Sequence, residues 1–160
     1  MWLPAVKKYT LSALEGTPTV LESLLKGLPA DLSLWDERPD PERFTLREMI
    51  AHLADWELIW KMRIERTLAE DNPALPDIDE GQRAIDNDYA RQNPLQNITR
   101  FRSGREATMK ILQTMTDEQW ERTAQRENIG EMSLSTFVTM MLAHDGYHTR
   151  QTAEWVQHSE

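Results

Sequence analysis

The segment that begins at Thr45 constrains the fold more than any other, because no glycine or proline interrupts it before Pro73. Thr45 and Glu48 have the spacing of a capping box, in which the two side chains accept hydrogen bonds from free backbone N–H groups at a helix start. Apolar residues then recur at three- and four-residue spacing: Met49, Leu53, Trp56, Ile59, Trp60 and Ile64. This pattern predicts a long amphipathic helix that ends near Leu68 or Glu70.

Proline marks the start of two further predicted helices. Thr17 followed by Pro18 predicts an N-cap and a first helical position, for a helix that closes near Gly27 to Pro29. Pro94 predicts the first position of another helix, which Gly104 weakens without ending. The residues expected on the buried face of this helix are Leu95, Ile98, Phe101, Met109, Leu112 and Met115.

The last helix is predicted to start at a cap on Ser133 and to run almost to the end of the sequence. Its expected inner face carries Leu134, Phe137, Val138, Met141, His144, His148, Gln151 and Trp155. Between the long helices, we expect Asp79 to cap a short helix, Thr116 to cap a short turn and Gly130 to lie in a loop.

Residues 1–16 have no clean period, and no segment alternates with period two for long enough to predict a strand. Four principal helices with long connections predict an all-α helix bundle. At 160 residues, the chain is expected to form one domain, residues 1–160.

Composition excludes several classes of function. The absence of cysteine rules out thiolate nucleophiles and cysteine-based zinc sites. With 27 acidic and 18 basic residues the formal net charge is -9, which disfavours nucleic acid as a partner. Arg100, Arg102 and Arg105 form a basic cluster without interleaved aromatic residues, so we interpret it as a solvated helix face.

We expect a cytoplasmic protein that does not bind membranes. No apolar run approaches the about 18 residues that span a bilayer, and the first residues lack the apolar core of a signal peptide. Six tryptophans are many for this length, and they indicate a well-filled bundle or a dimer.

Two of the four histidines, His144 and His148, are four residues apart in the last predicted helix and therefore share one face. Such a pair either satisfies its nitrogens through local hydrogen bonds or holds a transition metal. This pair shares its face with apolar residues, and two inward imidazoles without a metal would need several hydrogen-bond partners. His52 lies on the apolar face of the helix that follows Thr45. Three inward histidines favour a metal site.

The pair also approaches the His-Glu-x-x-His motif of zinc proteases, with Asp145 next to His144 where the motif has glutamate. Aspartate is one methylene shorter than the glutamate that acts there as general base. The few residues after His148 leave no room for the second helix that supplies the usual third ligand, and Glu154 and His158 lie off the face of the pair. A protease of this type is not expected.

The segments Phe44–Trp56 and His144–Gln151 together resemble the DinB superfamily, also called the DinB/YfiT-like metalloenzymes. The resemblance rests on His-Leu-x-Asp-x-Glu, which starts at His52, with a late His-x3-His-x2-Gln, and it covers almost the whole chain in length and helix order. It implies an antiparallel four-helix bundle, commonly a homodimer, with a divalent metal held by three histidines. By position these ligands match His52, His144 and His148.

The resemblance implies chemistry at an open metal site. Three imidazoles leave coordination positions free, where an ion can activate a bound water or thiol. Zinc and nickel both accept imidazole. Asp55 and Gln151, one turn after His52 and His148, are candidates to orient a ligand or to touch a metal-bound molecule, and equally ordinary polar helix residues.

Superfamily members include thiol-dependent S-transferases and isomerases that use bacillithiol, mycothiol or glutathione, and others are labelled metal-dependent hydrolases. We therefore expect a metal-dependent enzyme with a small-molecule substrate, such as an S-transferase that uses a low-molecular-weight thiol. The alternatives are a metal-dependent hydrolase and a non-catalytic, stress-related dimeric bundle.

Overall fold

Four long helices form the body of the protein in a computed structural model that describes residues 2–38 and 40–157. They are α1 (Pro4–Leu24), α2 (Leu46–Ala69), α4 (Pro94–Thr114) and α6 (Leu134–Gln157). The shorter elements are η1 (Ser33–Asp36), β1 (Ala74–Leu75), α3 (Glu80–Asp86), η2 (Tyr89–Arg91), α5 (Asp117–Trp120), β2 (Thr123–Arg126) and β3 (Gly130–Ser133).

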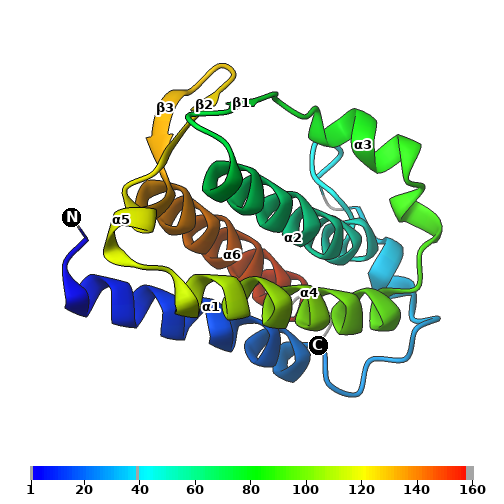
Figure 1. The fold of residues 1–160 in the computed structure, drawn as a ribbon. Coiled ribbons are helices and arrows are strands. Elements are labelled where there is room, and N and C mark those ends of the chain that lie inside the picture. Colours follow the sequence, from blue (N-terminus) through cyan, green and yellow to red (C-terminus); the bar gives the residue numbers. More distant parts are fainter. Residues whose placement is uncertain (1, 39, 158–160) are drawn as a thin grey trace.

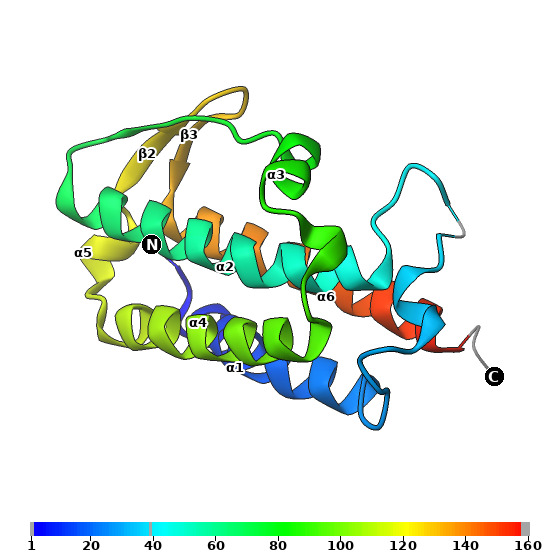
Figure 2. The same ribbon diagram turned by 90° about the vertical axis from the view of Figure 1, so that its right-hand side faces the viewer.

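The long helices run in two directions. Figures 1 and 2 show α1 and α6 pointing one way and α2 and α4 the other. The parallel neighbours are α2 with α4 and α1 with α6, and the antiparallel ones are α1 with α4 and α2 with α6. The predicted all-α four-helix bundle is confirmed. Within the described residues, no helix is long and apolar enough to cross a membrane.

Because α2 and α4 run in the same direction, the chain must return along the bundle between them. Residues 70–93 make this crossover, which includes β1, α3 and η2 and passes along the outer side of α2 (Figure 2). The crossover matters for function because α3 and η2 pass close to the first third of α2, where His52 lies.

The starts of α2, α3 and α4 follow the predicted local signals. Thr45 and Glu48 form the full capping box, with Glu48 N donating to Thr45 Oγ1 at 3.2 Å and Thr45 N donating to Glu48 Oε2 at 2.8 Å. Asp79 caps α3, and Pro94 is the first residue of α4. Such caps replace the hydrogen bonds that the first backbone N–H groups of a helix cannot make within it.

The prediction that a helix starts at Thr17 and Pro18 is wrong, because α1 begins at Pro4 and Pro18 lies inside it. A proline within a helix removes the donor to the carbonyl four residues earlier, here Leu14. Arg105 of α4 supplies the missing donor, since its Nη1 lies 2.8 Å from Leu14 O. Helix α1 therefore continues through its proline because a neighbouring helix completes the lost hydrogen bond.

The expectation of no strands is also wrong, although the sheet is small. β1 pairs with β2 in parallel, and β2 pairs with β3 antiparallel from Thr123↔Ser133 to Arg126↔Gly130. Strands of two to four residues are too short for an alternating pattern to appear in the sequence. Gly130, expected in a loop, opens β3 with a φ of +102° that favours glycine.

The tryptophans account for much of the core. Trp35, Trp56, Trp60, Trp120 and Trp155 are buried within the single chain, and Trp2 packs on Trp120 with ring centroids 5.0 Å apart. Their abundance therefore fits a well-filled bundle. Leu95 was predicted to lie on the buried face of α4, but its side chain is 40% exposed; the other residues predicted there are buried.

Candidate metal centre

Helices α2 and α6 bring three histidines together in the interior. His52 Nε2 lies 3.0 Å from His144 Nε2, although the two residues are 92 positions apart. The ring of His148 lies 4.5 Å from that of His144 and 5.0 Å from that of His52, between centroids. One nitrogen from each ring falls within 4.8 Å of the others. The structure thus gathers all three histidines that the sequence predicted to face inward.

Burial keeps these imidazoles neutral. Desolvation, with smaller contributions from the neighbouring His148 and His144, lowers the pKa of His52 to about 2. Desolvation lowers the pKa of His144 to about 3, with contributions from His148 and Arg105. The pKa of His148 is also lowered by burial. Neutral imidazole is the form that binds a metal ion.

The donor set fits a divalent transition metal. Two nitrogens bound at about 2.1 Å to one ion are roughly 3.0 to 3.4 Å apart, and the two Nε2 atoms of His52 and His144 are separated by 3.0 Å. Buried nitrogens normally have a hydrogen-bond partner. Nδ1 of His52 and Nδ1 of His144 have none within the described chain. Three converging imidazoles with so few protein partners suit a shared cation better than a hydrogen-bonded cluster.

Aromatic rings surround the cluster. Trp56 lies 4.9 Å from His52, Trp60 lies 5.8 Å from His144, and Phe44 lies 5.3 Å from His52, between ring centroids. These rings exclude water from the histidines, which strengthens electrostatic interactions there.

Gln151 lies beside the cluster, as its position one turn after His148 suggested. One end of its amide is 2.7 Å from His148 Nδ1. The other end is 2.7 Å from Arg43 Nη2 and 3.1 Å from the Tyr147 hydroxyl. Gln151 can therefore fix the orientation of the His148 ring.

The hydrogen bonds that Asp55 forms within the described residues run to the crossover and not to the histidines. Its carboxylate accepts from Arg83 Nη2 at 2.9 Å and from the Tyr89 hydroxyl at 2.6 Å, and Arg83 Nε also donates to it. Burial and the Asp55 carboxylate raise the pKa of Tyr89. Asp55 thus ties α3 and η2 to α2 across the side of the bundle that carries His52.

A buried ionic network, which the sequence analysis missed, lies next to the histidines. Arg105 of α4 donates to Glu57 at 2.8 and 3.1 Å and to Asp145 at 2.6 and 3.1 Å. Burial lowers the pKa of Arg105, but the carboxylates of Glu57 and Asp145 outweigh this effect and raise it. The prediction that Arg105 belongs to a solvated face is wrong, because its side chain is 2% exposed. Its four-residue spacing from both Phe101 and Met109 could have indicated this burial.

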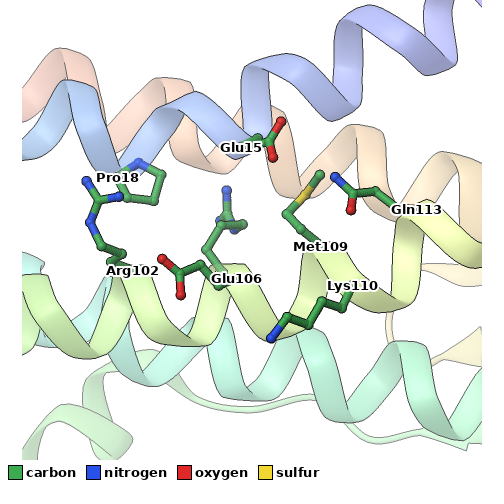
Figure 3. Close-up of a pocket in the computed structure, with 8 residues that line it drawn as sticks. Glu15, Pro18, Arg102, Glu106, Met109, Lys110 and Gln113 are labelled. Atoms are coloured by element: carbon green, nitrogen blue, oxygen red, sulfur yellow. The ribbon is translucent and has the colours of Figure 1, made fainter.

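Two pockets differ in their relation to the histidines. One, of about 290 Å³, is lined by His148 together with Arg43, Glu80, Tyr147 and Gln151, and lies between the loop before α2, the start of α3 and α6. The other, of about 250 Å³, lies between α1 and α4 (Figure 3). Charged side chains of both signs line the second pocket, and none of the three histidines does. The first pocket is therefore the candidate entrance to the metal centre.

Comparison with known proteins agrees with this geometry. The family model of the DinB superfamily matches residues 13–152, so the chain belongs to the DinB superfamily. A similar solved structure is YfiT from Bacillus subtilis, described as a probable metal-dependent hydrolase with an unusual four-helix bundle topology. The two chains are 20% identical, with a TM-score of 0.91 over 99% of this chain and 90% of YfiT. A search of curated proteins found no match.

Proposed function

We propose that His52, His144 and His148 bind one divalent metal ion, zinc or nickel, and that the protein is a metal-dependent enzyme acting on a small molecule. The observation that carries the proposal is the convergence of three neutral, largely buried imidazoles from two helices. Three protein ligands leave coordination positions open, which is typical of catalytic rather than structural sites.

A bound ion would lower the pKa of a water or thiol that it holds, so that a nucleophile is available at neutral pH. The protein's own contribution is positional. Gln151 orients the His148 ring through its contact with Nδ1, and the aromatic rings of Trp56 and Trp60 keep bulk water away. The pocket beside His148 has room for a small substrate.

The leading reaction is transfer of a low-molecular-weight thiol to an electrophilic carbon, in which the thiol loses its proton and the leaving group departs. This choice rests on the superfamily resemblance. The second candidate is hydrolysis by an activated water, which the description of YfiT favours. A non-catalytic bundle is the third outcome that the experiment must separate.

Activity assays on metal-loaded protein distinguish these alternatives. Thiol-dependent conjugation of a model electrophile supports the transferase, and turnover of ester, amide or lactone substrates without added thiol supports the hydrolase. Each activity should be lost in His148→Ala and kept in Arg91→Ala, a control at an exposed side chain of η2. Metal binding without either activity would contradict the proposed enzymatic function and favour a non-catalytic role.

A further inference from the structure

The pocket at His148 has one cationic side chain close to the metal centre, Arg43. This residue lies in the loop before α2, its side chain is 29% exposed, and its guanidinium packs on Trp155 at 5.3 Å from the ring centroid. Stacking on an aromatic ring holds the planar guanidinium in place and leaves its edge free to donate.

Within the described residues, the ion pair of Arg43 is a long one, with Glu154. Glu154 Oε2 lies 4.0 Å from Arg43 Nη2, whereas Glu154 Oε1 lies 2.6 Å from Arg150 Nη1. The groups within hydrogen-bond distance of Arg43 Nη2 and Nε belong to the Gln151 amide, at 2.7 and 3.1 Å. A guanidinium forms stronger hydrogen bonds to an anion than to a neutral amide, so an anionic ligand in the pocket can replace Gln151 as the acceptor for Arg43.

Gln151 links Arg43 to the metal centre, because its amide touches both Arg43 and His148. If the amide oxygen accepts from Arg43, the amide NH₂ donates to His148 Nδ1, and the ring proton must then sit on Nε2. If Nε2 binds a metal, Nδ1 carries the proton and needs the amide oxygen, as ring nitrogens of metal-bound histidines do. The NH₂ group then faces Arg43, which can only donate. Metal binding therefore leaves Arg43 without its amide acceptor.

We infer that this pocket binds the carboxylate group of a small organic substrate or thiol cofactor, with Arg43 as the anion-binding residue. The inference rests on the proposed function, because a metal ion on His148 is what frees the Arg43 edge. Glu42 and Glu80 also line the pocket. Their negative charge disfavours phosphate and other multiply charged anions, so a single carboxylate is the ligand that the pocket fits best.

The test uses two thiol probes of the same chain length that differ in their end group, the carboxylate of 3-mercaptopropionate and the neutral hydroxyl of 3-mercaptopropan-1-ol, titrated calorimetrically into zinc-loaded protein. Wild-type protein should bind the carboxylate about tenfold or more tightly than the alcohol, as a charge-assisted bidentate contact provides. Arg43→Gln should abolish this preference while the zinc content stays unchanged. Arg150→Gln is the matched control. Arg150 also pairs with Glu154 but does not line the pocket, so this variant should keep the preference for the carboxylate probe.

Equal affinity of wild-type protein for the two probes would overturn the inference, and so would an undiminished preference in Arg43→Gln. Tighter binding of inorganic phosphate than of 3-mercaptopropionate would also contradict it. If the protein binds neither zinc nor nickel, the proposed function fails separately. In metal-free protein the same two probes should show little or no Arg43-dependent preference, because the Gln151 amide then occupies the Arg43 edge. An equal preference with and without zinc would overturn the proposed link between Arg43 and the metal centre.

Discussion

His52 Nε2 and His144 Nε2 face each other at 3.0 Å across the interface of α2 and α6. Both rings are held by long helices whose backbones are fixed by core packing, so the separation of the two nitrogens is set by the bundle itself. A ligand pair built on helices is more rigid than one built on loops. The proposed metal centre is therefore organised before any ion arrives.

Gln151→Ala should weaken metal binding about 10- to 100-fold without unfolding the protein, because His148 loses the partner that orients its ring. Competition titration with a chromogenic chelator measures this change. Gln157→Ala, at an exposed position near the end of α6, is the control and should leave the affinity unchanged. Wild-type affinity in Gln151→Ala would exclude an orienting role.

Arg105→Met should lower the free energy of unfolding by about 3–5 kcal/mol, because it leaves the buried carboxylates of Glu57 and Asp145 without their cation. It also removes the donor that satisfies Leu14 O. Arg102→Met breaks an ion pair with Glu22 in which both side chains are more than a third exposed, and it should cost no more than about 1 kcal/mol. Urea denaturation compares the two variants, and equal losses would show that burial of Arg105 adds nothing.

Gly104→Ala should destabilise the protein by about 1–3 kcal/mol, although alanine is the better helix former. A Cβ at Gly104 would lie 2.9 Å from Glu57 Cγ, and Arg105 holds Glu57 in place. Gly16→Ala in α1 is the matched control, because nothing lies within 4 Å of its added Cβ. That variant should gain about 0.5–1 kcal/mol, as measured by urea denaturation. A gain in both variants would mean that α2 and α4 are not packed this closely.

Metal-free protein should lose stability as the pH falls below about 6.5. Burial holds the pKa of His52 at about 2 and that of His144 at about 3, so the unfolded chain binds protons that the folded chain does not. Each of these histidines then lowers the free energy of unfolding by up to about 1.4 kcal/mol per pH unit, from pH 6.5 toward pH 3.

His144→Gln removes one of these contributions, so its unfolding free energy should fall less steeply between pH 7 and pH 5 than that of the wild type. Urea denaturation after EDTA treatment measures both slopes. Identical slopes would mean that His144 titrates alike in the folded and unfolded chains.

Local signals were sufficient for the helix starts at Thr45, Asp79 and Pro94, because a cap depends on residues a few positions apart. Pro18 could not be placed in this way. Its position inside α1 depends on Arg105, which is 91 positions from the Leu14 carbonyl that it satisfies. The burial of Arg105 depends in turn on carboxylates from α2 and α6, which no local pattern brings together.

The candidate site was predictable in part for the same reason. Helical spacing put His144 and His148 on one inward face, and His52 on the apolar face of α2, but only helix packing sets the distance between them. Asp55 and Gln151 had equal standing in the sequence, each one turn after a histidine. Asp55 binds Arg83 and Tyr89 instead, because the crossover passes over its side of α2.

The metal content of untagged protein tests the central claim most directly. Mass spectrometric metal analysis of the purified wild type should find close to one zinc or nickel ion per chain, and His52→Ala, His144→Ala and His148→Ala should each lose most of it. His158→Ala, at the one histidine outside the described residues, should keep it. The three-histidine metal centre would be contradicted if wild-type protein takes up neither zinc nor nickel, or if these three variants retain one metal ion per chain.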